Sequence, residues 1–230
     1  MYASSIRARL ALAEGSSQAA PMTTELILLR HGETEWNSLG RFQGHLDSPL
    51  SSEGLRQADL LAARLSSVSF QALYSSDLGR AVETARRIAN RTGHALRQDG
   101  RLRERALGVL EGLTREEASQ RHPEVFAEYS AGGPDFVVPR GESTSQRLRH
   151  ALECLEELGA RHAGERVVVV THGGVLSLLF RHCLGIPFGT PRAFSVLNAC
   201  WNQFDYHEGK FRLVTWGDVN HLRVSSRDDT

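Results

Sequence analysis

The sequence predicts an α/β protein in which a mostly parallel central sheet carries helices on both faces, as a three-layer sandwich. From Glu25 onward, short apolar runs alternate with amphipathic segments, which is the order that such a sandwich requires. The run Val167–Val170 has no polar alternation, which is typical of a strand buried on both faces in the middle of a parallel sheet. No internal repeat or heptad array competes with this interpretation. We therefore expect one domain over residues 23–230, after a disordered leader over residues 1–22.

The leader is set apart by its composition. Residues 1–22 are rich in Ala, Ser and Arg, and Glu14 is their single acidic residue, which is weakly similar to an organelle presequence. We prefer the interpretation of a disordered leader, because nothing in this segment forms a periodic apolar face.

The first half of the domain alternates between strand and helix. Leu26–Leu29 predicts the first strand, and Ser51–Ser66 predicts a helix because its apolar residues recur every three or four positions. Phe70–Tyr74 returns to strand. Asp77 is the expected N-cap of the next helix, and this places Arg80 in the first helical turn.

The second half repeats the alternation. Thr114 and Glu117 form a capping box for a short helix, and the apolar stripe of residues 148–158 predicts a longer one. After the valine strand, Cys200–Tyr206 and Phe211–Trp216 predict two more strands.

Composition excludes several classes of function. Among the 230 residues, Lys plus Arg number 27 and Asp plus Glu number 27, so no general basic surface is available for nucleic acid or an anionic membrane. No apolar run approaches the ~20 residues of a membrane span. The three cysteines lack Cys-x-x-Cys spacing, which argues against a disulfide framework or a zinc knuckle. We expect a cytoplasmic protein with reduced thiols.

Two histidines follow predicted strands directly. His31 comes after the first strand within Arg-His-Gly, and His172 comes after the valine strand within Thr-His-Gly. Because the carboxyl ends of parallel strands meet at one edge of a sheet, both histidines are expected to face one crevice. Arg30 and Arg80 add guanidinium groups there. Their donors and a nearby helix N-terminus together favour a phosphate ligand.

This set of side chains suits phosphoryl transfer. A phosphoryl group in transfer spreads negative charge over its oxygens, and fixed cationic donors stabilise that charge. His31 has to be neutral to attack phosphorus, and Arg30 and Arg80 are expected to lower its pKa while its second nitrogen donates to the backbone. A zinc site at His31 and His172 is disfavoured, because Arg30 would repel a cation and no ligand spacing is present. We expect neither a metal nor another cofactor.

The nine residues 29–37, Leu-Arg-His-Gly-Glu-Thr-Glu-Trp-Asn, resemble the signature of the histidine phosphatase superfamily in its phosphoglycerate mutase-like branch. The similarity extends over Glu25 to Leu222. Further matching motifs occur in order at residues 41–44, 75–80, 101–104, 141–143 and 171–174.

The resemblance implies a role for each matching residue. His31 would be the phosphorylated nucleophile, and Glu104 would be the proton donor. Arg30, Arg80 and His172 would hold the transferring phosphoryl group. The substrate-binding residues that it implies are Thr34, Asn37, Gln43, Gly44, Gly173 and Gly174.

Two carboxylates compete for the role of general acid. Arg103 and Arg105 flank Glu104 and favour its ionised form, whereas a general acid has to carry a proton. A bound phosphate dianion would supply the opposing charge, so protonation of Glu104 is expected to accompany substrate binding. Glu111, in the turn-like residues 108–112, remains the rival.

Four further residues have weaker interpretations. Glu33 and Glu142 are expected to organise the arginines of the pocket without taking a chemical step, although a helix-start charge explains Glu142 equally well. Asp218 and His221 resemble a catalytic pair, but a loop hydrogen bond after the final strand is the preferred interpretation.

Three hypotheses of function follow. The preferred one is a metal-independent phosphatase that hydrolyses small phosphate monoesters through a phosphohistidine. The second is a 2,3-bisphosphoglycerate-dependent phosphoglycerate mutase, which typically carries a longer insertion between the acid and the second histidine. The third is a non-catalytic module that binds a phosphorylated ligand. Residues 113–141 are basic and aromatic, which leaves sugar phosphates and phosphoglycerates as candidate small-metabolite substrates, and no motif indicates an oligomeric state.

Overall fold

Six strands form one sheet in the computed structural model, which describes residues 22–225. Their order is β3-β2-β4-β1-β5-β6, and the pairs β1–β4, β2–β4 and β2–β3 are parallel, while β5 and β6 are antiparallel. The sheet is therefore mostly parallel, as predicted. The predicted leader lies outside the described residues apart from Met22. The strands are β1 (Thr24–Arg30), β2 (Ala72–Ser75), β3 (Leu96–Gln98), β4 (Arg166–Thr171), β5 (Trp201–His207) and β6 (Lys210–Asp218).

The valine strand has the predicted central position. β4 lies between β2 and β1 and is parallel to both. All four residues of Val167–Val170 are 0% exposed. Each buried valine side chain contributes about 1.5–3 kcal/mol of hydrophobic free energy, so this strand is a main source of stability for the sheet.

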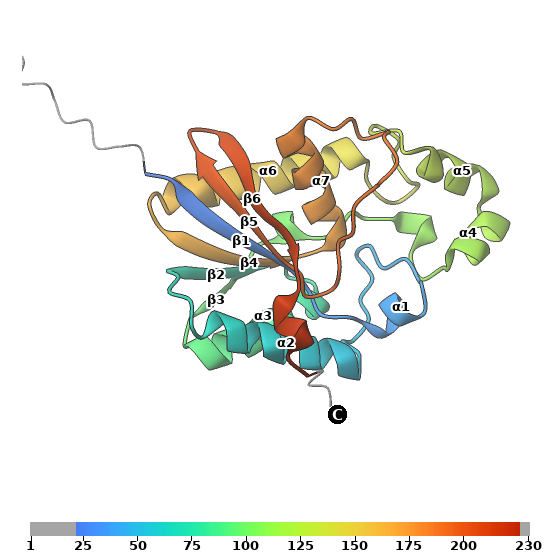
Figure 1. Cartoon of the computed structure of the whole chain (residues 1–230). Helices are drawn as coiled ribbons and strands as arrows, with labels where there is room; N and C mark the ends of the chain where they lie inside the picture. Colours follow the sequence, from blue (N-terminus) through green and yellow to red (C-terminus); the bar gives the residue numbers. More distant parts are fainter. Residues whose placement is uncertain (1–21, 226–230) are drawn as a thin grey trace, which may run out of the picture.

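Helices cover both faces of the sheet, which confirms the three-layer sandwich (Figure 1). On one face, α2 and α3 bury their apolar stripes against Ile27 and Val168. On the other face, α6 and α7 pack against Leu26 and Val167. The helices are α1 (Glu35–Ser38), α2 (Ser52–Leu65), α3 (Gly79–Thr92), α4 (Arg115–Arg121), α5 (Pro123–Ala131), α6 (Thr144–Arg161) and α7 (Gly173–Leu184).

The helix caps follow the sequence prediction at α4 and depart from it at α3. Ser51 caps α2 through its side chain, and Thr114 forms the predicted capping box at α4. The predicted cap of α3 is wrong. Leu78 occupies that position without a side-chain cap, because Asp77 instead binds Arg103 through two hydrogen bonds of 2.6 Å.

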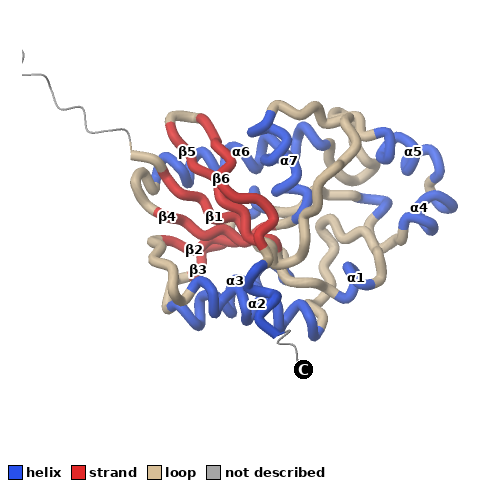
Figure 2. Tube along the Cα trace, in the orientation of Figure 1, coloured by secondary structure: helices blue, strands red, loops and turns tan. Residues whose placement is uncertain are grey.

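A second, smaller core lies beyond the carboxyl ends of the strands. In Figure 2, α1, α4 and α5 lie on this side of the sheet, connected mainly by loops. Phe42 and Tyr129 pack against the small core and bring the cap formed by α4 and α5 to the edge of the sheet. Its buried residues are Leu107, Leu110, Ala118 and Val138.

Strand register places the two histidines at one level. β1 and β4 pair so that Arg30 lies opposite Thr171, and His31 and His172 are the next residues of their chains. The predicted meeting of both histidines at one edge of the sheet follows from this register. Within residues 22–225, no helix has both the length and the apolar composition needed to cross a bilayer.

Candidate active site

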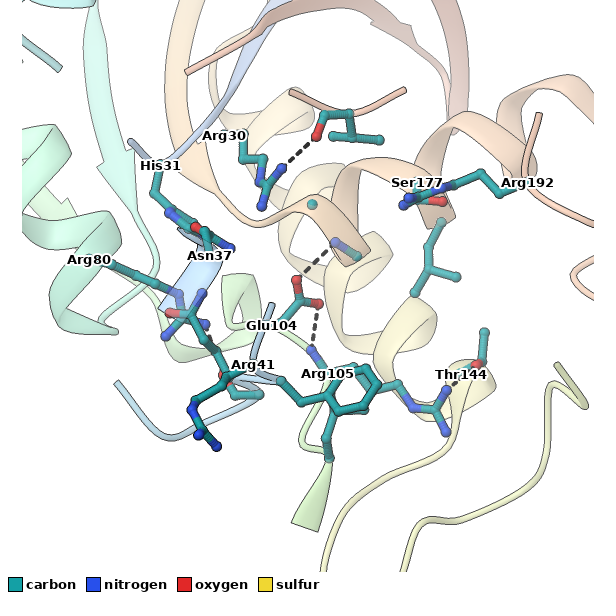
Figure 3. Close-up of a pocket in the computed structure, with 18 of the residues that line it drawn as sticks. Arg30, His31, Asn37, Arg41, Arg80, Glu104, Arg105, Thr144, Ser177 and Arg192 are labelled. Atoms are coloured by element: carbon teal, nitrogen blue, oxygen red, sulfur yellow. Dashed lines mark hydrogen bonds between the residues drawn. The ribbon is translucent and has the colours of Figure 1, made fainter. Parts of the chain in front are cut away.

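A pocket of about 390 Å³ opens at the carboxyl ends of β1 and β4. His31, Arg30 and Arg80 line one end of it, Glu104 lies in the middle of the view, and Ser177 and Arg192 lie at the other end (Figure 3). We call these the phosphate end and the distal end of the pocket.

His31 lines the phosphate end of the pocket, and His172 lies directly beside it without lining the pocket. Their ring centroids are 5.2 Å apart, and the residues are 3% and 0% exposed. Neither ring nitrogen of His172 has a hydrogen-bond partner among the described residues. A buried polar group without a partner is costly, so both ring nitrogens of His172 keep their capacity to hydrogen-bond.

His31 is held as a neutral ring with one nitrogen available. Its Nδ1 lies 2.7 Å from the carbonyl of Gly32, and because a carbonyl only accepts, Nδ1 carries the proton and Nε2 carries the lone pair. Burial lowers the pKa of His31 well below its ordinary 6.5, and the charges of Arg80 and Arg30 lower it further. The neutral ring and the backbone bond agree with the sequence prediction, although burial and not the arginines is the main cause.

Arg80 is fixed by the backbone of a neighbouring segment. Its Nη2 donates to the carbonyl of Gly44 at 2.9 Å, and its Nη1 donates to the carbonyl of Leu46 at 3.1 Å and to Asp47 Oδ1 at 2.9 Å. The residue is 2% exposed, and its buried Nε has no partner in the described chain. The guanidinium is thus oriented before a ligand arrives and retains one donor for it.

Arg30 lies against the first turn of α7. Its Nη1 donates to the carbonyl of Val196, and its buried Nε has no partner among residues 22–225. A Cβ at Gly173 would lie 3.3 Å from that Nε. A glycine at this position therefore lets the guanidinium approach the N-terminus of the helix, where free backbone N–H groups also favour an anion.

Glu104 is seated on backbone N–H groups in the pocket. Its Oε2 accepts a hydrogen bond from the backbone of Gly174 at 2.9 Å, and its Oε1 accepts one from the backbone of Arg105 at 2.8 Å (Figure 3). A Cβ at Gly174 would lie 2.0 Å from Oε1, so only glycine allows the carboxylate to approach this closely.

The arginines that flank Glu104 have other partners. Arg103 binds Asp77, and Arg105 donates to the carbonyls of Glu142 and Phe136 and to the hydroxyl of Thr144. Neither guanidinium group forms a hydrogen bond with the carboxylate of Glu104 in the described structure, because each is bonded to these other acceptors.

Glu111, the rival acid, is occupied as a structural carboxylate. It accepts hydrogen bonds from the backbone N–H groups of Leu107 and His45 at 2.8 and 2.9 Å, and from that of Leu46 at 3.3 Å. It does not line the pocket. Gly44, beside it, has a φ of +56°, and a Cβ there would lie 2.1 Å from Glu111 Oε1, so this turn requires glycine.

The comparison with known proteins agrees with this geometry. Residues 26–219 match the sequence model of the histidine phosphatase superfamily (branch 1). The chain belongs to this superfamily. Membership confirms the resemblance inferred from residues 29–37.

This histidine phosphatase is similar over most of its length to two relatives and one solved structure. Phosphoglycerate mutase-like protein 4 of Arabidopsis thaliana is 40% identical over 202 residues, which are 86% of each protein. Metal-independent phosphoserine phosphatase of Arabidopsis thaliana is 38% identical over 202 residues, which cover 86% of this chain and 83% of the relative. The structure of YhfR from Bacillus stearothermophilus is 36% identical with a TM-score of 0.81, over 86% of this chain and 99% of that chain.

The residues expected to bind substrate fall into two groups. Asn37, Gln43, Gly44 and Gly173 line the pocket of the histidine phosphatase. Gln43 Oε1 is buried without a partner in the described range. Gly173 provides the first residue of α7. These positions are consistent with contact to a bound phosphate ester.

Thr34 and Gly174 differ from the expectation. Thr34 does not line the pocket, because its side chain caps α1 by accepting from the backbone of Asn37 at 3.1 Å. Gly174 lines the pocket, but its N–H donates to Glu104. Both therefore position other site residues.

The interpretation of Glu33 as a partner of the site arginines is wrong. Its Oε1 accepts from the hydroxyl of Ser51 at 2.7 Å. Glu142 Oε1 accepts a hydrogen bond from the backbone N–H of Ala106 at 2.9 Å and lies 3.8 Å from Arg147 Nη1. Arg147 does not line the pocket. It organises the chain next to Glu104 instead of the phosphate-end arginines.

The pair formed by Asp218 and His221 is structural, as preferred. Asp218 Oδ2 accepts a hydrogen bond from Arg64 Nη2 at 2.6 Å, and Arg64 Nη1 lies 3.3 Å from His221 Nδ1. Burial lowers the pKa of His221 to about 4. Neither residue lines the pocket.

The distal end contains residues that sequence reasoning did not select. Arg192 and Ser177 line it, and Arg105 lies over the ring of Tyr129 at 5.5 Å. Tyr129 is the one pocket residue from the basic and aromatic region 113–141. No motif marks Arg192, because it reaches the pocket from a long loop between α7 and β5.

The described residues do not form a metal site. Within residues 22–225, no group of three His, Cys, Asp or Glu side chains gathers closely enough to hold a metal ion. The residues at the phosphate end are suited to an anion.

Proposed function

We propose that this chain is a metal-independent phosphatase that hydrolyses small phosphate monoesters through a phosphohistidine on His31. One observation carries the proposal. A buried neutral His31, with Nδ1 bonded to Gly32, faces buried donors of Arg30 and Arg80 that have no partner in the described chain. A nucleophile with a lone pair beside unpaired cationic donors is the arrangement that phosphoryl transfer requires.

In the first step, Nε2 of His31 attacks phosphorus and the bond from phosphorus to the ester oxygen breaks. Arg30, Arg80 and His172 stabilise the negative charge on the phosphoryl oxygens. Glu104 gives its proton to the departing alkoxide, so the product leaves as an alcohol.

In the second step, water attacks the phosphorus of phosphohistidine and the bond from nitrogen to phosphorus breaks. The carboxylate of Glu104 takes the proton of this water, which restores both groups to their starting states. His31 leaves as a neutral ring because its low pKa disfavours the imidazolium.

A phosphoglycerate mutase is the second candidate, supported by the name of the first relative. A mutase has to retain a bisphosphorylated intermediate and exclude water from phosphohistidine. Such retention needs several fixed cations at the far side of the pocket, whereas only one of the two arginines there, Arg105, is held by hydrogen bonds, and Arg192 is exposed. We therefore favour hydrolysis.

The proposed substrate is a small phosphorylated metabolite, because the pocket has a volume of about 390 Å³. Phosphoserine, named for one relative, is a reasonable first test. We also propose a cytoplasmic location, since Cys154, Cys183 and Cys200 are all free thiols.

Trapping the intermediate tests the mechanism. Rapid quenching during turnover of radiolabelled p-nitrophenyl phosphate should leave an acid-labile, base-stable label on His31, and vanadate should inhibit in the presence of EDTA. A label on serine or cysteine, or activity that EDTA abolishes and zinc restores, contradicts the proposal.

Product analysis separates hydrolysis from isomerisation. With 3-phosphoglycerate as substrate and 2,3-bisphosphoglycerate as primer, phosphorus NMR should detect inorganic phosphate forming faster than 2-phosphoglycerate. Faster isomerisation would identify a mutase that uses the same residues.

A further inference from the structure

His45 connects two segments that the proposed chemistry requires to be aligned. It lies in the loop of residues 44–47, whose oxygens hold Arg80. Its side chain contacts the segment that carries Glu104. Neither the family motif nor the pocket lining includes it.

The loop side of the connection is rigid. Gly44, Leu46 and Asp47 each accept a hydrogen bond from the guanidinium of Arg80. The backbone N–H of His45, between them, donates to Glu111 at 2.9 Å. A displacement of this loop would therefore move Arg80.

The other side of the connection is the backbone of the acid itself. His45 Nε2 lies 2.9 Å from the carbonyl oxygen of Glu104, so this nitrogen carries the proton and donates it. The carboxylate of Glu142 is farther from the same nitrogen, at 3.9 Å. The imidazole thus bonds to Glu104 by its main chain while the carboxylate of Glu104 remains in the pocket.

We propose that His45 is a positioning residue for Glu104, which sets the distance between the phosphate clamp at Arg80 and the proton donor. This inference rests on the proposed function, in which Glu104 protonates the leaving group. Proton transfer requires about 2.6–3.2 Å between heavy atoms, so a small displacement of the acid is costly. Binding of the phosphate depends on Arg80 and is not the step that this hydrogen bond adjusts.

The test compares phenyl phosphate with p-nitrophenyl phosphate, two substrates of similar shape. Phenolate is the poorer leaving group and needs protonation more. His45→Ala should lower kcat/KM for phenyl phosphate about tenfold, the effect of one lost hydrogen bond at the acid, and change kcat/KM for p-nitrophenyl phosphate less than about twofold. The comparison uses kcat/KM because this constant reports the steps up to release of the alcohol and leaves out the second step, in which Glu104 acts as the base for both substrates. His45→Gln retains an N–H donor of similar reach and should restore most of the lost rate.

His94 provides the matched control. Its Nε2 lies 2.8 Å from the carbonyl of Phe70, a contact of the same kind, and the residue is half-buried like His45 but far from the pocket lining. His94→Ala should change kcat/KM for neither substrate, even if it lowers the melting temperature. A loss of stability alone is thereby separated from a loss of positioning.

A double-mutant cycle identifies the group through which His45 acts. Glu104→Gln should reduce kcat/KM for phenyl phosphate more than kcat/KM for p-nitrophenyl phosphate, and adding His45→Ala should cause no further loss in this constant. Equal losses on both substrates in His45→Ala would mean that it acts through Arg80 and would overturn the inference. Equal losses in Glu104→Gln would instead reject Glu104 as the acid, which is a failure of the proposed function.

Discussion

The phosphate end and the distal end of the pocket differ in burial and in how their side chains are held. At the phosphate end, His31 and Arg80 are 3% and 2% exposed, and backbone carbonyls orient both. At the distal end, Arg192 is exposed, and the described chain provides no hydrogen bond to its guanidinium. The phosphate end is therefore preorganised for one chemical group, the phosphoryl group, while the exposed side chain of Arg192 at the distal end can adapt to different ligands.

This difference in burial suggests a division of roles: the phosphate end carries out the reaction, and the distal end selects the substrate. Preorganised donors stabilise a transition state without reorganising, which is where catalytic free energy is gained. Exposed cations contribute little binding free energy each but adapt to varied alcohols. Substitutions at the two ends should therefore have effects of very different size and kind.

The largest effect is expected at His31. His31→Ala should lower kcat at least about 10⁴-fold and abolish the covalent label, because His31 is the only histidine among the described residues that line the pocket. Stopped-flow and quench measurements on p-nitrophenyl phosphate test this. Retention of a labelled protein in His31→Ala would place the nucleophile elsewhere.

A smaller loss is expected at Arg80. Arg80→Lys keeps the positive charge but cannot bond to Gly44, Leu46 and Asp47 together while directing a further donor at the phosphate. We expect kcat/KM to fall about 10²-fold for every phosphate ester alike. A loss confined to some esters would assign Arg80 to substrate choice and remove the distinction between the two ends.

Burial at the phosphate end also predicts a pH dependence of stability. Burial lowers the pKa of His31 and of His172 well below 6.5, so below that pH the unfolded chain binds protons that the folded chain does not. Stability is then complete above about pH 6.5 and decreases as pH falls toward the low folded-state pKa values.

Urea unfolding of the wild type and of His31→Gln between pH 7 and pH 5 measures this contribution. The variant should lose less stability on acidification, by a difference that rises to about 1.4 kcal/mol per pH unit well below pH 6.5, because one buried neutral histidine is absent. Identical slopes for the two proteins would mean that His31 is not buried in its neutral form.

The smallest effect is expected at the distal end. Arg192→Ala should raise KM for phosphoserine about threefold and leave kcat for p-nitrophenyl phosphate unchanged, since an exposed cation provides about 0.2–1 kcal/mol. Arg149→Ala is the control, because Arg149 is an exposed arginine outside the pocket. A large fall in kcat in Arg192→Ala would show that the distal end is part of the catalytic machinery.

Regular elements could be predicted where one pattern dominates. The valines of β4, the stripe of α2 and the capping box of α4 were identified because burial and capping leave local signatures. β3 has three residues, and α5 buries none of its residues, so neither carries a periodic signal. The predicted N-cap of α3 is wrong because the carboxylate of Asp77 has a stronger partner, Arg103, that is distant in sequence.

The sequence by itself determined which residues meet at the phosphate end. His31 and His172 directly follow two parallel strands, so their approach depends on the local order of strand, histidine and glycine. The tertiary structure decided the roles of the carboxylates. Glu104 enters the pocket, whereas Glu111 bonds to a backbone loop. It also decided that Arg192 and His45 belong near the site, because contacts between residues far apart in sequence leave no local pattern.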